Sequence, residues 1–180
     1  MLEQVILVDE QDAPLGTMEK MEAHRKGLLH RAFSVFVFTP AGELILQRRA
    51  AHKYHSPGLW TNTCCSHPRD GEEVEAAAHR RLVEEMGFDT EIKHAFSFIY
   101  KQQVGELIEH ELDHVFVGEW EGEPKLNPEE TDAWKAMSLE ALERDVAAHP
   151  ENYTVWFRIC LDQVLQHYRK ATAPLEKTPQ

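Results

Sequence analysis

The chain has 180 residues, 42% of them hydrophobic and 28% charged, which is typical of a soluble globular domain with a sizeable core. Its formal net charge of −12 argues against nonspecific binding to nucleic acid or to an anionic membrane, since both would repel it. Three cysteines, two of them adjacent, suggest no disulfide framework, and neither a basic leader nor an apolar run of about 20 residues is present. We expect a cytoplasmic protein, a monomer or weak homodimer, that binds neither membranes nor nucleic acid.

The first part of the chain is predicted to form strands separated by turns. Residues 5–8 are apolar and β-branched, and the turn-rich residues 12–16 follow them. The β-branched and aromatic run 33–38, the turn at 40–42 and the apolar run 44–46 together predict a hairpin, with His30 near its start.

The second part alternates between helix and strand patterns. In residues 72–86 an apolar residue recurs every four positions, and Gly87 stands where a left-handed helix end is expected. Strands are predicted at 92–100 and 107–117, and helices at 139–147 and 155–168. Mixed strands flanked by helices indicate an α/β or α+β sandwich. We expect one domain over residues 1–170 and a flexible tail at 171–180.

Two short motifs carry chemical groups at strand spacing. Cys65 and His67 are two residues apart, so they share one face of an extended segment, while Cys64 points to the other face. Glu109 and Glu111 repeat this spacing around His110. A thiol, imidazoles and paired carboxylates suggest metal-assisted chemistry, although a free cysteine is more often a small buried apolar residue.

The segment from Ser66 to Phe88 resembles the Nudix box, a loop and helix that hold a divalent metal against a diphosphate. Two positions depart from that pattern: Ser66 replaces the first glycine, and Arg81 replaces the glutamate that follows the box arginine. Loss of a metal carboxylate should weaken pyrophosphate hydrolysis, whereas a guanidinium favours binding of the diphosphate.

Together with residues 58–68 and 109–111, these departures make the chain similar to type I isopentenyl-diphosphate delta-isomerases from Glu19 to Trp156. The resemblance implies an αβα sandwich with a mixed sheet and the Nudix loop and helix. It also implies an enzyme that interconverts isopentenyl and dimethylallyl diphosphates, small prenyl diphosphates of isoprenoid biosynthesis, by adding and removing protons.

The resemblance also implies a metal site for Mn²⁺ or Zn²⁺. Its residues are His24, His30, His67, Glu109 and Glu111. Imidazoles and carboxylates from separated segments suit a first-row divalent ion. Any one of the 11 histidines, taken alone, is more often a surface or hydrogen-bonded core residue than a ligand.

Cys65 and Glu111 are implied as the proton-transfer pair, acting on opposite faces of a flat alkene. Trp156 would stabilise the cationic intermediate through its π face, or would simply anchor the core. Tyr100 would orient Glu111 or relay a proton. Because a free thiol titrates near about 8.5, a nearby cation or metal would be needed to supply thiolate at neutral pH.

A cationic group is implied for the diphosphate, consisting of Lys20, Arg49, Lys53 and Arg81, with Mg²⁺ bound by Glu85. For Arg49 the plainer interpretation is a solvated charge at a strand end, as for Arg48. Two other functions stay open: a Nudix hydrolase acting on a nucleoside diphosphate derivative, and an inactive Nudix module that binds a diphosphate or a protein. The first lacks the box glutamate, and neither gives Cys65 a role.

Overall fold

A computed structural model describes residues 2–173, so the tail predicted at 171–180 lies almost entirely outside the described residues. The elements are β1 (Gln4–Val8), β2 (Pro14–Glu19), α1 (Lys20–Lys26), β3 (His30–Phe38), β4 (Glu43–Arg49), β5 (Trp60–Thr61), β6 (Cys64–Ser66), α2 (Val74–Met86), β7 (Ile92–Val104), β8 (Leu107–Glu119), β9 (Thr131–Ser138), α3 (Leu139–Ala148), the 3₁₀ turn η1 (Pro150–Asn152) and α4 (Val155–Thr172). In residues 2–173 no helix is long and apolar enough to span a membrane.

The strands form one mixed sheet organised around β3. Strand β3 pairs antiparallel with β1, β4 and β6, and parallel with β8. The parallel register runs from His30 opposite Glu111 to Phe38 opposite Glu119. This crossover connection brings segments that are distant in sequence into direct contact.

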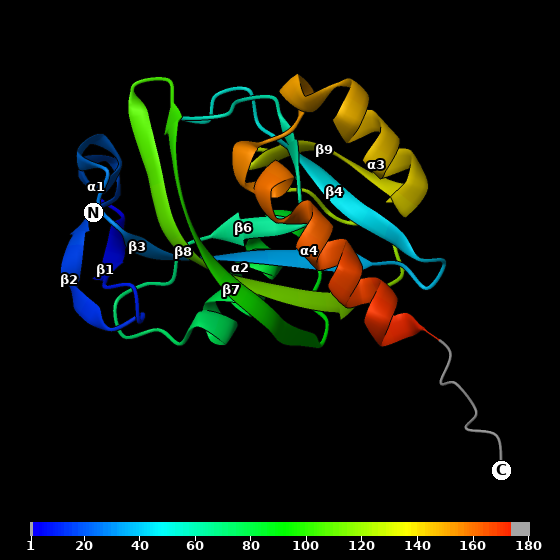
Figure 1. Cartoon of the computed structure of the whole chain (residues 1–180), viewed down its shortest axis with the longest axis horizontal. Helices are drawn as coiled ribbons and strands as arrows, with labels where there is room; N and C mark the ends of the chain where they lie inside the picture. Colours follow the sequence, from blue (N-terminus) through cyan, green and yellow to red (C-terminus); the bar gives the residue numbers. More distant parts are fainter. Residues whose placement is uncertain (1, 174–180) are drawn as a thin grey trace, which may run out of the picture.

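Helices cover both faces of the sheet, as Figure 1 shows with α4 across the near face and α2 behind the sheet. Side chains of β3 alternate between two apolar clusters. Phe36 and Phe38 pack with residues of α4, whereas Val35 and Val37 pack with residues of α2. The predicted αβα sandwich with a mixed sheet is confirmed.

Helix α2 follows from its apolar repeat, starting two residues later than predicted. Ala78, Leu82 and Met86 are fully buried, so the stripe faces the sheet. Gly87 ends the helix with φ of 72°. A Cβ there would lie 2.5 Å from the carbonyl oxygen of Lys125, so this position needs glycine for both its conformation and the close approach.

Three elements near the site have weak local signals. The segment predicted as a turn at 12–16 contains the start of β2, an exposed edge strand without apolar alternation. Helix α1 has only seven residues; Glu19 caps it by accepting the N–H groups of Met21 and Glu22, and Gly27 ends it. Strand β9 is half-buried and pairs with β4.

Candidate active site

A cavity of about 660 Å³ opens between β3, β6, β8 and the first turn of α4. Most residues predicted for the site line it: Lys20, Arg49, Lys53, Cys65, His67, Arg81, Glu85, Tyr100, Glu111 and Trp156. The other three, His24, His30 and Glu109, are fully buried and lie outside the lining. The sequence-predicted residues are therefore brought together around one cavity and its wall.

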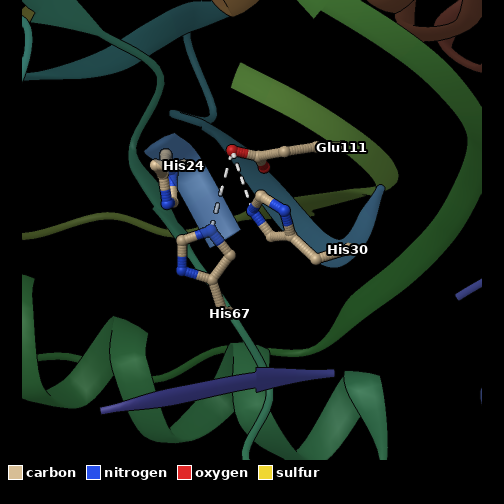
Figure 2. A group of neighbouring side chains, drawn as sticks. All are labelled: His24, His30, His67 and Glu111. Carbon is tan, nitrogen blue, oxygen red and sulfur yellow. Dashed lines mark ion pairs between the residues drawn. The ribbon is translucent and has the colours of Figure 1, made fainter. Parts of the chain in front are cut away.

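The predicted metal ligands form one group, which we call the histidine–glutamate cluster: His24, His30, His67, Glu109 and Glu111. Figure 2 shows the rings of the three histidines and the Glu111 carboxylate turned toward one another. One ligand atom from each of these four residues lies within 4.8 Å of the others. Glu111 Oε1 lies 3.8 Å from His30 Nε2 and 3.6 Å from His67 Nε2, and Glu109 Oε1 lies 3.4 Å from His24 Nε2.

Sheet register assembles this cluster. His30 opens β3 directly opposite Glu111 of the parallel strand β8. His67 follows β6, which pairs with β3 on its other side, and His24 lies on α1, which packs against β8. Glu109 and Glu111 share one face of β8, while His110 Nδ1 is hydrogen-bonded to the carbonyl of Gly27 outside the cluster.

The cluster has the features of a metal site. The Nδ1 atoms of His24 and His30 lie 2.6 and 2.9 Å from the carbonyl oxygens of Lys20 and Leu28. A carbonyl only accepts, so each Nδ1 carries the proton and each Nε2 presents a lone pair. Those two Nε2 atoms and both oxygens of Glu109 are buried without a hydrogen-bond partner among the described residues. A divalent ion would satisfy them, and a set of imidazoles and carboxylates fits one.

Burial also sets the protonation of two of the candidate ligands. It lowers the pKa of His30 to about 4 and that of His67 well below its usual range, so both are neutral at pH 7. Against burial, contacts with Glu109 raise the pKa of His24. Burial and the neighbouring Glu109 charge raise the pKa of Glu111. Against burial, contacts with Glu111, His24 and His55 hold the pKa of Glu109 well below its usual range. Neutral imidazoles are the form that binds metal.

Cys65 and Glu111 reach the cavity from two strands that flank β3. Cys65 of β6 pairs with Ser34, and Glu111 of β8 pairs with His30. Cys64 points the other way, into the core beneath α2, as the strand alternation predicted. Burial raises the pKa of the Cys65 thiol while the nearby Arg49 opposes this rise, so the thiol is the resting form.

Aromatic residues form the cavity wall. The Trp156 indole donates its N–H to Asn62 Oδ1 at 3.3 Å, and the Arg49 guanidinium lies 5.4 Å from the indole centroid. Tyr100 of β7 is the cross-strand neighbour of Glu111. Burial raises the pKa of the Tyr100 hydroxyl, which therefore stays protonated.

The predicted cationic group lines the cavity and is largely paired with acids. Lys20 Nζ lies 2.6 Å from Glu3, and Lys53 Nζ lies 2.6 Å from Glu130. Arg81 contacts Glu130 at 3.0 Å and Glu85 at 2.7 Å.

Arg49 differs from the other three cations. It is buried and donates to the His55 carbonyl at 3.3 Å, and it has no carboxylate partner among the described residues. The adjacent Arg48 is half-buried and pairs with Asp132. Of these two arginines, Arg49 is therefore the one that lies in the cavity.

Glu85, the residue predicted to bind Mg²⁺, is 4% exposed and lines the cavity. One of its oxygens accepts from Arg81 and the other from the Gln47 amide at 2.8 Å. Each carboxylate oxygen still has a second lone pair, so these two contacts leave Glu85 able to accept a cation.

Comparison with known proteins agrees with this geometry. The NUDIX domain model matches residues 28–157. The chain is 58% identical over 166 residues to "Isopentenyl-diphosphate Delta-isomerase 2" of Aromatoleum aromaticum, covering 92% of this chain and 88% of that protein. It is 51% identical to "Isopentenyl-diphosphate Delta-isomerase" of Serratia proteamaculans, covering 86% and 87%. The chain belongs to the isopentenyl-diphosphate Delta-isomerase family. The predicted family resemblance is thereby confirmed.

Solved structures place this isomerase family member among Nudix folds. A Deinococcus radiodurans protein aligns with a TM-score of 0.69 at 21% identity, covering 81% of this chain and 90% of that one. A MutT protein of Methanosarcina mazei aligns with a TM-score of 0.62 at 18% identity, covering 80% and 96%. At these identities the likeness shows the fold.

Three residues that the sequence interpretation missed lie in or beside this family member's site. His55 lies against Glu109, and Glu130 bridges Lys53 and Arg81. Asp113 accepts from the Ser34 hydroxyl at 2.8 Å beside the cavity. For Asp113 the strand alternation that selected Glu109 and Glu111 extends two residues further, so a local signal existed. For His55 and Glu130 we find no local signal.

Proposed function

We propose that this chain interconverts isopentenyl and dimethylallyl diphosphates, with Cys65 and Glu111 as the proton-transfer pair. One observation carries the proposal: both residues line a cavity that also contains the cationic group. Membership of the isomerase family supports it. The alternative of a Nudix hydrolase gives Cys65 no role.

The reaction needs one proton added and one removed. Protonation of the terminal methylene of isopentenyl diphosphate leaves a tertiary cation, and loss of a proton from the carbon nearer the diphosphate gives the dimethylallyl product. Since Cys65 and Glu111 come from strands on either side of β3, we propose that they act on opposite faces of the alkene. General acid or base action contributes about 10²–10⁴-fold in rate for each group.

The aromatic residues of the cavity wall and the cationic group would stabilise the intermediate, orient Glu111 and bind the diphosphate. The Trp156 ring would stabilise the tertiary cation, which is worth about 2 kcal/mol or more in a desolvated site. Tyr100 would orient Glu111 across the β7–β8 pair. The cationic group would bind the diphosphate with Mg²⁺ at Glu85, and Mn²⁺ or Zn²⁺ in the histidine–glutamate cluster would hold Glu109 and Glu111 in place.

An incubation in heavy water tests the proposal. Wild-type protein with Mg²⁺ and isopentenyl diphosphate should form dimethylallyl diphosphate that carries deuterium in the new methyl group. Cys65→Ala and Glu111→Gln should each slow this conversion by about 10²-fold or more, because each removes one proton-transfer group. Cys64→Ala is the matched control, since it removes a thiol from the opposite face of the same strand.

Two results would contradict the proposal. Release of phosphate without a dimethylallyl product would identify a hydrolase. Full conversion by Cys65→Ala would show that the thiol takes no part in the reaction. Diphosphate binding should persist in Cys65→Ala because the cationic group is intact, and this can be measured by titration.

A further inference from the structure

His55 lies in the loop between β4 and β5 and is buried beside the histidine–glutamate cluster. Its Nε2 atom is 2.9 Å from Glu109 Oε1, a shorter contact than His24, His30 or His67 makes with either glutamate. His24, His55 and Glu109 also bring one ligand atom each within 4.8 Å of one another. His55 therefore either binds the metal itself or holds the ligand Glu109.

The tautomer of the ring distinguishes these roles. His24 and His30 donate Nδ1–H to backbone carbonyls, which leaves Nε2 free as a metal ligand. The Nδ1 atom of His55 is buried and has no hydrogen-bond partner among residues 2–173. A proton at Nδ1 would be a buried N–H without an acceptor, whereas a proton at Nε2 lies next to the Glu109 carboxylate. The neutral ring thus carries its proton at Nε2, where it is a donor and not a ligand.

The surroundings fix the ring in this position. It packs edge-on against Trp156, with centroids 5.5 Å apart, and lies nearly parallel to His24 at 5.8 Å. The His55 carbonyl accepts from Arg49 Nε at 3.3 Å, which ties the loop to the end of β4. Because both the backbone and the ring of His55 are held in place, this residue is suited to orienting the neighbouring Glu109.

We propose that His55 is a positioning residue: its Nε2 atom lies 2.9 Å from Glu109 Oε1 without a well-aligned hydrogen bond in this structure, and in the metal-bound protein its Nε2–H would donate to this carboxylate and hold it in the orientation that binds the metal. The inference rests on the metal centre of the proposed function. Outer residues that orient metal ligands typically change metal affinity by about 10–100-fold when they are removed.

Two polar substitutions of different reach test this role. The amide nitrogen of glutamine reaches about as far as His Nε2, whereas that of asparagine reaches only as far as Nδ1. His55→Gln should keep the Mn²⁺ dissociation constant within a few-fold of wild type, and His55→Asn should raise it by about 10–100-fold. The control is His52→Asn in the same loop, where the ring is exposed and contacts Glu129, and it should leave Mn²⁺ binding unchanged. Free Mn²⁺ in titrations of metal-depleted protein gives these constants by electron paramagnetic resonance.

Cobalt spectra separate a positioning role from direct ligation. The visible absorption of Co²⁺ depends on how many ligands surround it, so Co²⁺-loaded wild type and His55→Asn should give the same band positions and intensities. A changed coordination number in His55→Asn would make His55 a ligand and overturn the proposal. Equal Mn²⁺ affinity in His55→Asn and wild type would overturn it as well. The heavy-water assay on wild type does not depend on either measurement. A failure of the proposed isomerase activity can therefore be distinguished from a failure of the role proposed for His55.

Discussion

The two ends of the cavity satisfy their polar groups in opposite ways. In the histidine–glutamate cluster, His24, His30 and Glu109 keep buried lone pairs that have no hydrogen-bond partner in the part of the chain that the structure describes. In the cationic group, Lys20, Lys53 and Arg81 are already neutralised by Glu3, Glu85 and Glu130. The first end lacks partners that a cation would supply, whereas at the second end three of the four cations already have carboxylate partners.

This difference predicts what each end contributes. Unpaired buried carboxylates and imidazoles destabilise the fold, so metal binding and folding are coupled at the first end. At the second end a diphosphate must compete with carboxylates for three of the cations. Arg49, which has no such carboxylate among residues 2–173, should carry the largest share of diphosphate binding.

The largest expected effect comes from removing the metal. Thorough chelation should abolish isomerisation and lower the melting temperature by roughly 8–16 °C. This range follows from about 4 kcal/mol of stabilisation by an ion at 1,000 times its dissociation constant, at about 2–4 °C per kcal/mol. Scanning calorimetry before and after Mn²⁺ is restored measures the shift. Full activity in metal-free protein would contradict the assignment of the cluster.

Arg49→Met should have the next largest effect and tests the other end. A charge-assisted hydrogen bond is worth about 1.5–3 kcal/mol, so KM for isopentenyl diphosphate should rise by about 10–150-fold. Arg48→Met is the control, because Arg48 pairs with Asp132 on the surface and should leave KM unchanged. Equal effects of the two substitutions would mean that Arg49 does not bind the diphosphate.

Trp156 lies between the two ends: it packs edge-on against the ring of His55, which lies beside the histidine–glutamate cluster, and the Arg49 guanidinium lies 5.4 Å from its ring centroid. Trp156→Leu should lower kcat by roughly 30-fold, which corresponds to about 2 kcal/mol of cation stabilisation, and Trp156→Phe should lower it less. Phe157→Leu removes an aromatic ring from the same helix and core without changing the cavity lining. If Phe157→Leu and Trp156→Leu lower kcat equally, packing and not the indole face is the cause.

Asp113→Asn should have the smallest effect on activity and a clear effect on stability. Burial raises the pKa of Asp113 to about 7, above its unfolded value of about 3.9. The folded state therefore binds the extra proton between these pH values, and stability falls as pH rises through this window. Asparagine removes this destabilisation. The difference between these two pKa values corresponds to about 4 kcal/mol, so the melting temperature should rise by roughly 8–16 °C at pH 8 and change little near pH 4. A pH-independent difference would mean that Asp113 is ionised in the folded protein.

Much of the fold could be predicted because its signals are local. The apolar repeat of α2 ends at Gly87, and the alternation of β3 separates Val35 from Phe36, whatever the rest of the chain does. Strands β7 and β8 were found but extend to Val104 and Glu119, since their outer ends are stabilised by pairing with each other and not by apolar residues. Helix α1 and strand β9 were missed because their stability depends on docking against β8 and β4.

The sequence by itself determined which groups share a strand face: Cys65 with His67, and Glu109 with Glu111. This follows from the period of two along a strand, which any extended segment obeys. Family resemblance, and not spacing, joined those pairs to His24 and His30.

Only the tertiary structure decided which distant residues meet. His30 lies opposite Glu111 because β3 and β8 are parallel in one register, and no local pattern encodes that register. Glu130 bridges Lys53 and Arg81 through a loop, and His55 reaches Glu109 from another. Loop geometry depends on contacts across the whole domain, so these partners became visible only when the chain was folded.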